Sequence, residues 1–416
     1  MSFNPFKEKP LKIDEVYMDW KDMSVKPYNC KSVHPFTKLR LILLNGAEFE
    51  AVKFSHCFSR NCDDNDLRRE LCLIRRSEQQ QQKRLASFKP FDESILEHTI
   101  GYEQLAVELT SMLAQLEADP YVKKTLDFAL LEDFDHLYRY ADLLDIDEGI
   151  KAEQLVGELT EIMPGRPTIA EHRFPADDIK RYSNFAQSSL QTKLNVNIIT
   201  AAEQQTMNYY MNIGNFYKNK LGRDLYAEIA MIEEQHVSSY GSLLDTTCTW
   251  LENLLMHEYT ECYLYYSAMN DEKDKRIRDV YEQMFTQEIA HLHNALYLLN
   301  KYEKKEYQQV VGKGDFPQLL LFKSNIDYVR NVLANTINLT GYREDYVDVT
   351  DLKEESDFVS YQKTVNDPLK SVASHQVINK YIALNGNDYR FQVKQHPVQV
   401  LQNRQKDNTS VGRQIN

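Results

Sequence analysis

The sequence predicts an all-α fold in which antiparallel helical hairpins form a four-helix bundle, and three observations support this expectation. The first is a spacing: three times a Glu is followed thirty residues later by an acid, and three residues after that by a His. At about 1.5 Å per residue, one helix can descend about 22 Å and a second can return to the same level. Acid and His three positions apart share a helix face, so each triple can point into a bundle core. The triples are Glu103/Asp133/His136, Glu203/Glu233/His236 and Glu258/Glu288/His291.

The other two observations concern the residues between the members of each triple. Turn-forming residues lie near the midpoint of each pair of helices. In the first pair this turn contains Pro120, and a proline ends one helix and suits the start of the next. In the first pair, apolar residues keep helical spacing at Leu105, Leu109 and Met112. The expected hairpins are 93–144 with a turn at Asp119-Pro120, 196–244 with a turn at 218–222, and 249–302 with a turn at 270–275.

The spacing of thirty is the informative part of the pattern. With 62 acidic residues and 11 His in 416 positions, 11 × 62/416 gives about 1.6 acid-x-x-His pairs by chance, so three such pairs decide little. A Glu at the same distance before all three pairs is far rarer. The repeat therefore favours a structural explanation over coincidence.

Outside the hairpins the pattern is weaker. Residues 1–44 mix prolines with aromatic residues and predict an N-terminal arm along the surface. Residues 45–60 partly satisfy both the strand and the helix period, and helix is preferred because the following segment is rich in helix formers. Residues 303–416 predict a helical and irregular C-terminal extension with one helix near 325–339, and 403–416 are expected to be disordered.

Composition narrows the possible partners and the cellular compartment. The net charge of −13 argues against binding nucleic acid or an anionic membrane, because no basic face of the needed size is evident. The six cysteines form no C-x-x-C pair, which fits a reducing compartment. The longest apolar stretch, 39–44, is far too short to span a bilayer, and no signal peptide is evident. A soluble cytoplasmic protein is expected.

Linker lengths indicate which hairpins can surround one site. Two hairpins that share a two-metal site need a crossover as long as the bundle between their second and third helices. Residues 145–195 are ample for this crossover, whereas 245–249 cannot climb about 25 to 30 Å at about 3.3 Å per residue. Hairpins one and two are therefore the expected pair.

This pair would supply four carboxylates and two imidazoles to two Fe or Mn ions. Hard oxygen ligands with two borderline nitrogens suit these metals. Glu132 lies four residues before His136 and is an alternative to Asp133, which the spacing favours. The metals would carry the redox step, so no catalytic residue beyond the ligands and no organic cofactor site is expected. The expected ligands are Glu103, Asp133, His136, Glu203, Glu233 and His236.

Hairpin three has no evident partner within the chain. Its residues Glu258, Glu261, Glu288 and His291 form a possible second metal set, since carboxylates three positions apart face one site. The hairpin could compete with hairpin two for hairpin one, pair with its own copy in a homodimer, or only pack.

At these residues the chain resembles the ferritin-like superfamily, and within it the rubrerythrin-like diiron-carboxylate proteins. The similar segments are Ala201-Ala-Glu203 with Glu233-Glu-Gln-His236, and His257-Glu258-Tyr-Thr-Glu261 with Glu288-Ile-Ala-His291. The resemblance implies that 45–302 is a ferritin-like helical domain holding two irons that react with peroxide or dioxygen. No pair of C-x-x-C motifs is present, so a rubredoxin-like electron donor is absent and the donor is unknown. The resemblance pairs hairpins two and three, whereas linker reach pairs one and two, and reach is the stronger constraint.

Three functions follow as hypotheses. The first is a dimetal oxidoreductase whose partners are a small oxidant, peroxide or dioxygen, and an unknown electron donor. The second is iron oxidation and storage, which requires a large assembly. The third is a metal-free helical scaffold for a protein partner. The fold alone does not choose among them.

Overall fold

The computed structural model describes residues 3–402 except 387, 389 and 391–394. The described residues form fourteen α-helices, several 3-10 turns and one two-stranded sheet. The expected all-α class is confirmed. Within the described part of the chain, no helix combines the length and apolarity that crossing a membrane requires. The segment 403–416, expected to be disordered, lies outside the described residues.

The chain divides into two compact units that interleave along the sequence. This division differs from the single central domain expected over 45–302. One helix, α7 (Leu190–Ile213), is divided between the units at residues 202 and 203. Unit 1 comprises 1–93, 183–202 and 244–322, and unit 2 comprises 94–182, 203–243 and 323–416.

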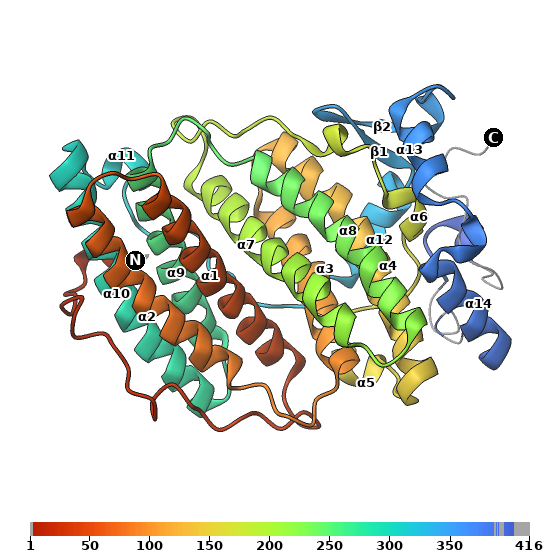
Figure 1. The fold of residues 1–416 in the computed structure, drawn as a ribbon, viewed down its shortest axis with the longest axis horizontal. Coiled ribbons are helices and arrows are strands. Elements are labelled where there is room, and N and C mark those ends of the chain that lie inside the picture. Colours follow the sequence, from red (N-terminus) through yellow and green to blue (C-terminus); the bar gives the residue numbers. More distant parts are fainter. Residues whose placement is uncertain (1–2, 387, 389, 391–394, 403–416) are drawn as a thin grey trace. The chain divides into compact units, whose positions relative to one another are not determined.

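Unit 1 is built on two helical hairpins. The first is α1 (Pro35–Arg60) with α2 (Asn65–Ala86), and the second is α9 (Trp250–Asp271) with α10 (Lys275–Glu303). Figure 1 shows α1 and α2, in red to orange, alongside α9 and α10, in teal; α1 contacts α9 and α2 contacts α10. Short elements η1 (Pro5–Lys7) and α11 (Gln308–Val311) pack on α10 and α9.

Side chains at the helix starts explain where these helices begin. The Asp64 carboxylate accepts hydrogen bonds from the first backbone N–H groups of α2, and Thr249 forms a capping box with Glu252 at the start of α9. Helix α1 begins with Pro35 in its first turn, ten residues before the expected start at 45, so the N-terminal arm is shorter than predicted. The apolar residues 39–44 are buried, and this burial explains the earlier start.

Unit 2 contains the hairpin of α3 (Ile95–Leu116) and α4 (Pro120–Glu148), helix α8 (Lys220–Ser242) and the second part of α7. Ser94 and Glu97 form a capping box on α3. Asp119 caps α4, Pro120 occupies its first turn, and the structure thus has the predicted turn between α3 and α4. Helix α4 ends at Gly149, whose φ of 66° is left-handed and suits glycine.

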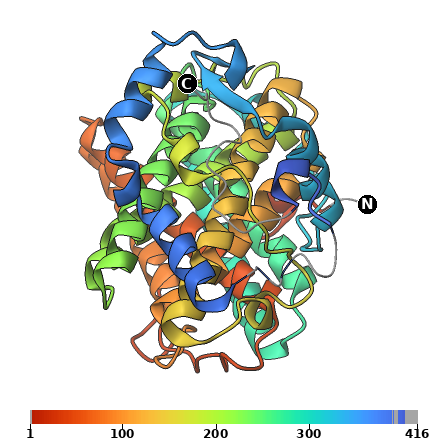
Figure 2. The same cartoon turned by 90° about the vertical axis from the view of Figure 1, so that its right-hand side faces the viewer.

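The remaining elements of unit 2 cover these helices. Helix α14 packs on α4 and α8, as Figure 2 shows in blue. The strands pair antiparallel with Leu339 opposite Asp348, so the helix expected near 325–339 ends earlier and leads into the sheet. These elements are α5 (Glu153–Val156), α6 (Thr168–Glu171), η2 (Pro175–Asp178), η3 (Gly214–Phe216), α12 (Ile326–Thr336), β1 (Leu339–Tyr342), β2 (Asp345–Asp348), η4 (Val349–Asp351), α13 (Asp357–Val365), η5 (Leu369–Ser371), α14 (Ala373–Asn385) and η7 (Gln399–Leu401).

Candidate metal centres

The structure brings together the six residues expected from hairpins one and two, and this group is called centre 2 because it lies in unit 2. Asp133, Glu203, Glu233 and His236 each place one ligand atom within 4.8 Å of the others, and Glu103, His136 and Glu233 form an overlapping group. All six side chains are buried. Glu233 belongs to both groups and therefore links the two halves of the centre.

Four helices supply the six residues of centre 2. Helix α3 supplies Glu103, α7 supplies Glu203, and α4 and α8 each supply an acid-x-x-His pair. Because residues three apart lie on one helix face, the acid and the His of each pair reach the same core. The spacing of thirty residues across each turn brings the single Glu to the same level as the pair.

Both histidines of centre 2 are held in the same orientation. The Nε2 atom of His136 lies 3.0 Å from Glu171 Oε2, and its Nδ1 lies 3.1 Å from Glu233 Oε1. The Nε2 atom of His236 lies 2.8 Å from Glu132 Oε2, and its Nδ1 lies 3.2 Å from Asp133 Oδ1. Each ring can therefore donate its Nε2–H outward and present Nδ1 to the carboxylate cluster.

Glu132 and Asp133 consequently occupy different places. Asp133 lies in the cluster, whereas Glu132 lies behind His236 and accepts hydrogen bonds from two buried arginines. Arg166 Nη1 lies 2.9 Å from Glu132 Oε1, and Arg173 also binds Asp178, with Nε to Oδ1 at 2.8 Å. Burial opposes ionisation, but Arg173 and the His236 hydrogen bond outweigh it and hold the pKa of Glu132 well below its usual range.

The connection 145–195 supplies the two arginines and Glu171 of this outer layer, and no sequence pattern indicated these three residues. Residues 166–173 carry both arginines and Glu171 on and beside the short helix α6. Gly165 permits the close approach to α4: a Cβ there would lie 2.8 Å from the carbonyl oxygen of Leu131. Its N–H donates to Asp135 Oδ1 at 2.8 Å. The crossover that lets the hairpins pair thus also orients their histidines.

The electrostatics of centre 2 suit a bound cation. Burial raises the pKa of Glu103 and Glu203 well above the usual value, whereas the two histidines outweigh burial and lower the pKa of Glu233 to about 2. Oxygen atoms of four carboxylates are buried without a hydrogen-bond partner among the described residues: Glu103 Oε2, Asp133 Oδ1, Glu203 Oε2 and Glu233 Oε2. Buried polar atoms are usually satisfied, so such a cluster indicates that protons or cations occupy it.

A second buried group lies in unit 1 and is called centre 1. Glu78, Glu258, Glu288 and His291 place ligand atoms within 4.8 Å of one another. Sequence reasoning found three of these residues but left hairpin three without a partner, and the structure supplies it: the α1–α2 hairpin. Glu48, Glu78 and Gln81 repeat the spacings of thirty and three, but a Gln stands where the other three sets have a His.

Centre 1 has one histidine, whereas centre 2 has two. His291 Nδ1 lies 3.1 Å from Glu288 Oε2, 3.7 Å from Glu78 Oε1 and 3.8 Å from Glu258 Oε2. The Gln81 side-chain amide donates to Glu288 Oε1. Burial is the largest cause that raises the pKa of Glu78 to about 8.

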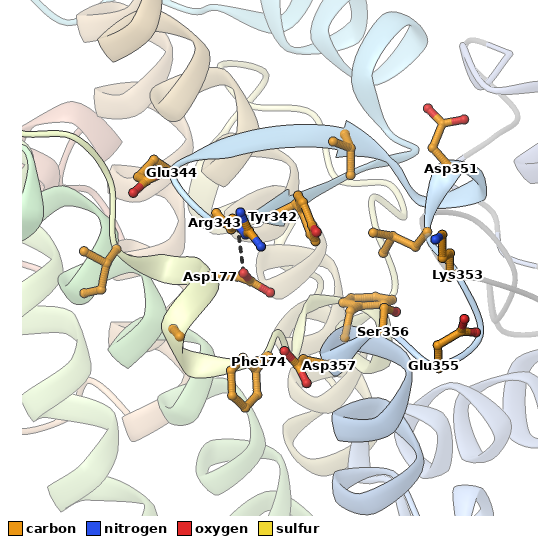
Figure 3. Close-up of a pocket in the computed structure, with 15 residues that line it drawn as sticks. Phe174, Asp177, Tyr342, Arg343, Glu344, Asp351, Lys353, Glu355, Ser356 and Asp357 are labelled. Carbon is orange, nitrogen blue, oxygen red and sulfur yellow. Dashed lines mark hydrogen bonds between the residues drawn. The ribbon is translucent and has the colours of Figure 1, made fainter.

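One surface pocket among the described residues contains no member of either centre. A pocket of about 720 Å³ lies between η2, the β1–β2 turn and the start of α13 (Figure 3). There the Asp177 carboxylate accepts a hydrogen bond of 2.7 Å from the backbone N–H of Arg343. The lining includes Glu344 and Lys353 but none of the residues expected to bind metal.

Comparison of the chain with family models, curated proteins and solved structures gave no match.

Proposed function

We propose that centre 2 binds two Fe or Mn ions and that the protein is an oxidoreductase reacting with peroxide or dioxygen. The observation that carries this proposal is the matched orientation of two buried imidazoles. Both turn Nδ1 toward the carboxylate cluster, and both place Nε2 against an outer carboxylate. The resemblance of the ligand motifs to those of rubrerythrin-like proteins supports the same function.

The donor set fits two cations of this kind. Four carboxylates offset the charge of two divalent ions, and carboxylate oxygens combined with imidazole nitrogens suit Fe and Mn. The buried oxygens that lack hydrogen-bond partners are atoms that a cation would satisfy. When bound, the metals would supply the redox chemistry toward peroxide or dioxygen.

The protein's own groups would hold the ligands and exclude water. Glu233, close to both imidazoles, would link the two metal positions. Glu132 and Glu171 would fix the imidazole rings by accepting their Nε2–H groups. Leu137 and Ile232, on the two helices that carry the acid-x-x-His pairs, have no exposed surface. They contribute to the dry core in which the ligands lie.

Metal analysis tests the proposal directly. Protein purified without chelator should contain Fe or Mn, and Glu233→Ala should lose two metal ions per chain while far-UV circular dichroism keeps the parent helix content. Glu234→Ala is the matched control, since Glu234 is adjacent, half-buried and bonded to Ser238 instead of the cluster. Full metal content in Glu233→Ala would refute the assignment.

An activity measurement separates the oxidoreductase from the other hypotheses. The loaded parent should consume peroxide or dioxygen with a chemical reductant, and Glu233→Ala should not. Iron storage would instead appear as a large assembly that holds many more ions per chain. Absence of metal after anaerobic reconstitution would favour the scaffold.

A further inference from the structure

We infer that unit 1 contains a second metal centre that binds a pair of divalent cations independently of centre 2. Compared with centre 2, it favours Mn²⁺ over Zn²⁺. Four helices, α1, α2, α9 and α10, supply its side chains. They are the four residues already assigned to centre 1, Glu78, Glu258, Glu288 and His291, together with Glu48, Gln81 and Glu261, which are buried beside them and are now included in centre 1.

The first observation behind this inference is a set of buried polar atoms that have no hydrogen-bond partner among the described residues. All seven side chains are almost fully buried, with at most 2% of each residue exposed. Both oxygens of Glu261 lack a hydrogen-bond partner among the described residues. So do Glu48 Oε2, Glu78 Oε1, Glu258 Oε2 and Gln81 Oε1. Leaving this many acceptors together in a core is costly unless a cation lies among them.

The second observation is that centre 1 repeats the construction of centre 2 beyond the ligands. In unit 2, Tyr210 lies seven residues after Glu203, and its hydroxyl donates to Glu103 Oε1 at 2.5 Å. In unit 1, Tyr265 lies seven residues after Glu258, and its hydroxyl donates to Glu48 Oε1. Seven residues are about two helical turns, so both tyrosines share a face with the preceding Glu. The contact between the α1–α2 and α9–α10 hairpins therefore repeats the contact between the α3–α4 and α7–α8 hairpins.

Charge favours two cations over one. Centre 1 contains five carboxylates, so one divalent ion would leave a formal charge of −3 in a buried site, whereas two leave −1. A cation with six ligands also cannot use all seven side chains at once. A pair of ions uses the whole set and leaves the smaller buried charge.

The preference for Mn²⁺ follows from the donor types. Centre 2 has two imidazoles, but centre 1 has only His291, and the position equivalent to the second imidazole is Gln81. One cation in centre 1 therefore has oxygen as its main donor. Carboxylate and carbonyl oxygens suit Mn²⁺, whereas imidazole raises the affinity for Zn²⁺.

Reciprocal variants of the full chain test for two independent pairs. After anaerobic loading with Mn²⁺, we expect four ions per chain in the parent, two in Glu288→Ala, two in Glu233→Ala and none in the double variant. Unchanged metal in Glu288→Ala, or an empty Glu233→Ala, would overturn the inference, and loss of one ion in Glu288→Ala would overturn the pair. Loss of two ions in Glu288→Ala with none lost in Glu233→Ala would refute the proposed function and leave centre 1 standing.

Variants that keep side-chain volume guard against misfolding. Glu258→Gln/Glu261→Gln removes two buried charges, so the metal-free protein should melt no lower than the parent. Mn²⁺ should raise the melting temperature of the parent through both centres, and of Glu233→Ala through centre 1 alone. Glu258→Gln/Glu261→Gln should lose the increase that comes from centre 1. Glu282→Gln, on the exposed face of α10, should behave like the parent. An unchanged Mn²⁺ response in Glu258→Gln/Glu261→Gln would contradict the inference.

Gln81→His tests the metal preference. Only centre 1 remains in the Glu233→Ala background, and only centre 2 remains in the Glu288→Ala background. After loading with equal concentrations of Mn²⁺ and Zn²⁺, the ratio of bound Mn to bound Zn should be higher at centre 1 than at centre 2. Adding the second imidazole should lower the ratio at centre 1 by roughly tenfold. An equal ratio at both centres, or no response to Gln81→His, would overturn the preference for Mn²⁺.

Discussion

Centres 1 and 2 begin from the same helical spacing but differ in what lies behind the imidazoles. In centre 2, Glu132 and Glu171 accept hydrogen bonds from the outward Nε2–H groups of the two histidines, and two arginines donate hydrogen bonds to Glu132. In centre 1, the Nε2 atom of His291 has no hydrogen-bond partner among the described residues. Helix spacing alone therefore brings the candidate ligand side chains together, whereas a separate segment helps to orient the imidazoles of centre 2.

Removing Arg173 should have the largest effect on the free energy of unfolding, and this effect should be confined to unit 2. In Arg173→Met, Glu132 loses one of its arginines and Asp178 stays buried without its cation. Breaking a buried ion pair on one side costs about 3 to 5 kcal/mol, so urea unfolding of the metal-free protein should show a loss of that size. Lys220→Ala, which breaks an exposed pair with Asp224, should cost less than about 1 kcal/mol. Equal losses would mean that the outer layer does not stabilise unit 2.

The loss of Glu171 should separate the centres by metal affinity. Glu171→Ala removes the carboxylate that accepts His136 Nε2–H, and such outer partners change affinity about 10- to 100-fold. Chelator competition should show this weakening at centre 2 and none at centre 1. Glu158→Gln, an exposed position on the same connection, is the control. Equal weakening at both centres would contradict the assigned role.

Gly165 tests whether the connection must lie close to α4. A methyl group there meets the Leu131 carbonyl oxygen at 2.8 Å, and overpacking of this kind costs about 1 to 3 kcal/mol. Gly165→Ala should therefore lower the free energy of unfolding and weaken metal binding at centre 2. At Gly241 in α8 nothing lies within 4 Å of an added Cβ, so Gly241→Ala should be neutral or slightly stabilising. A neutral Gly165→Ala would show that the approach is not tight.

The stability of unit 2, which contains His172, should depend on pH. Burial, with help from Arg173, lowers the pKa of His172 to about 4, below its value of about 6.5 in an unfolded chain. The folded state then binds fewer protons, so stability is full above pH 6.5 and falls as pH drops toward 4. Because the side chain is half-buried, we expect His172→Gln to recover about 1 to 2 kcal/mol at pH 4 relative to the parent. A difference that is flat with pH would contradict this. Metal-free protein should be used, since acid also releases metal.

The sequence predicted the helices and the proximity of the candidate ligand residues because both depend on local periods. Thirty residues and then three describe a hairpin, and the structure brings Glu103, Asp133, Glu203 and Glu233 together as that geometry requires. Linker reach also selected the pair of hairpins that meets in centre 2. Both are limits set by chain geometry, which a single sequence contains.

Two features could not be predicted by the same reasoning. The partner of hairpin three was hidden because Gln81 stands where a His was required, although Glu48 and Glu78 keep the spacing. The outer residues Arg166, Glu171 and Arg173 lie on an irregular connection, where contacts depend on tertiary packing and have no period. The spacing of thirty residues between a Glu and an acid, taken without the His, indicates the first feature and not the second.

The two tyrosines offer the smallest and most symmetrical comparison. Tyr210→Phe and Tyr265→Phe each remove one hydroxyl that donates to the first Glu of the opposite hairpin. A single hydrogen bond contributes about 1 kcal/mol net, so each variant should lose about that much from the free energy of unfolding. If the two centres are built alike, the losses should match within about 0.5 kcal/mol, and each should weaken metal binding only at its own centre. If only one of the two variants lost stability and metal affinity, only one of the two carboxylates would depend on its tyrosine hydroxyl. The two centres would then share a spacing but not the role of the tyrosine.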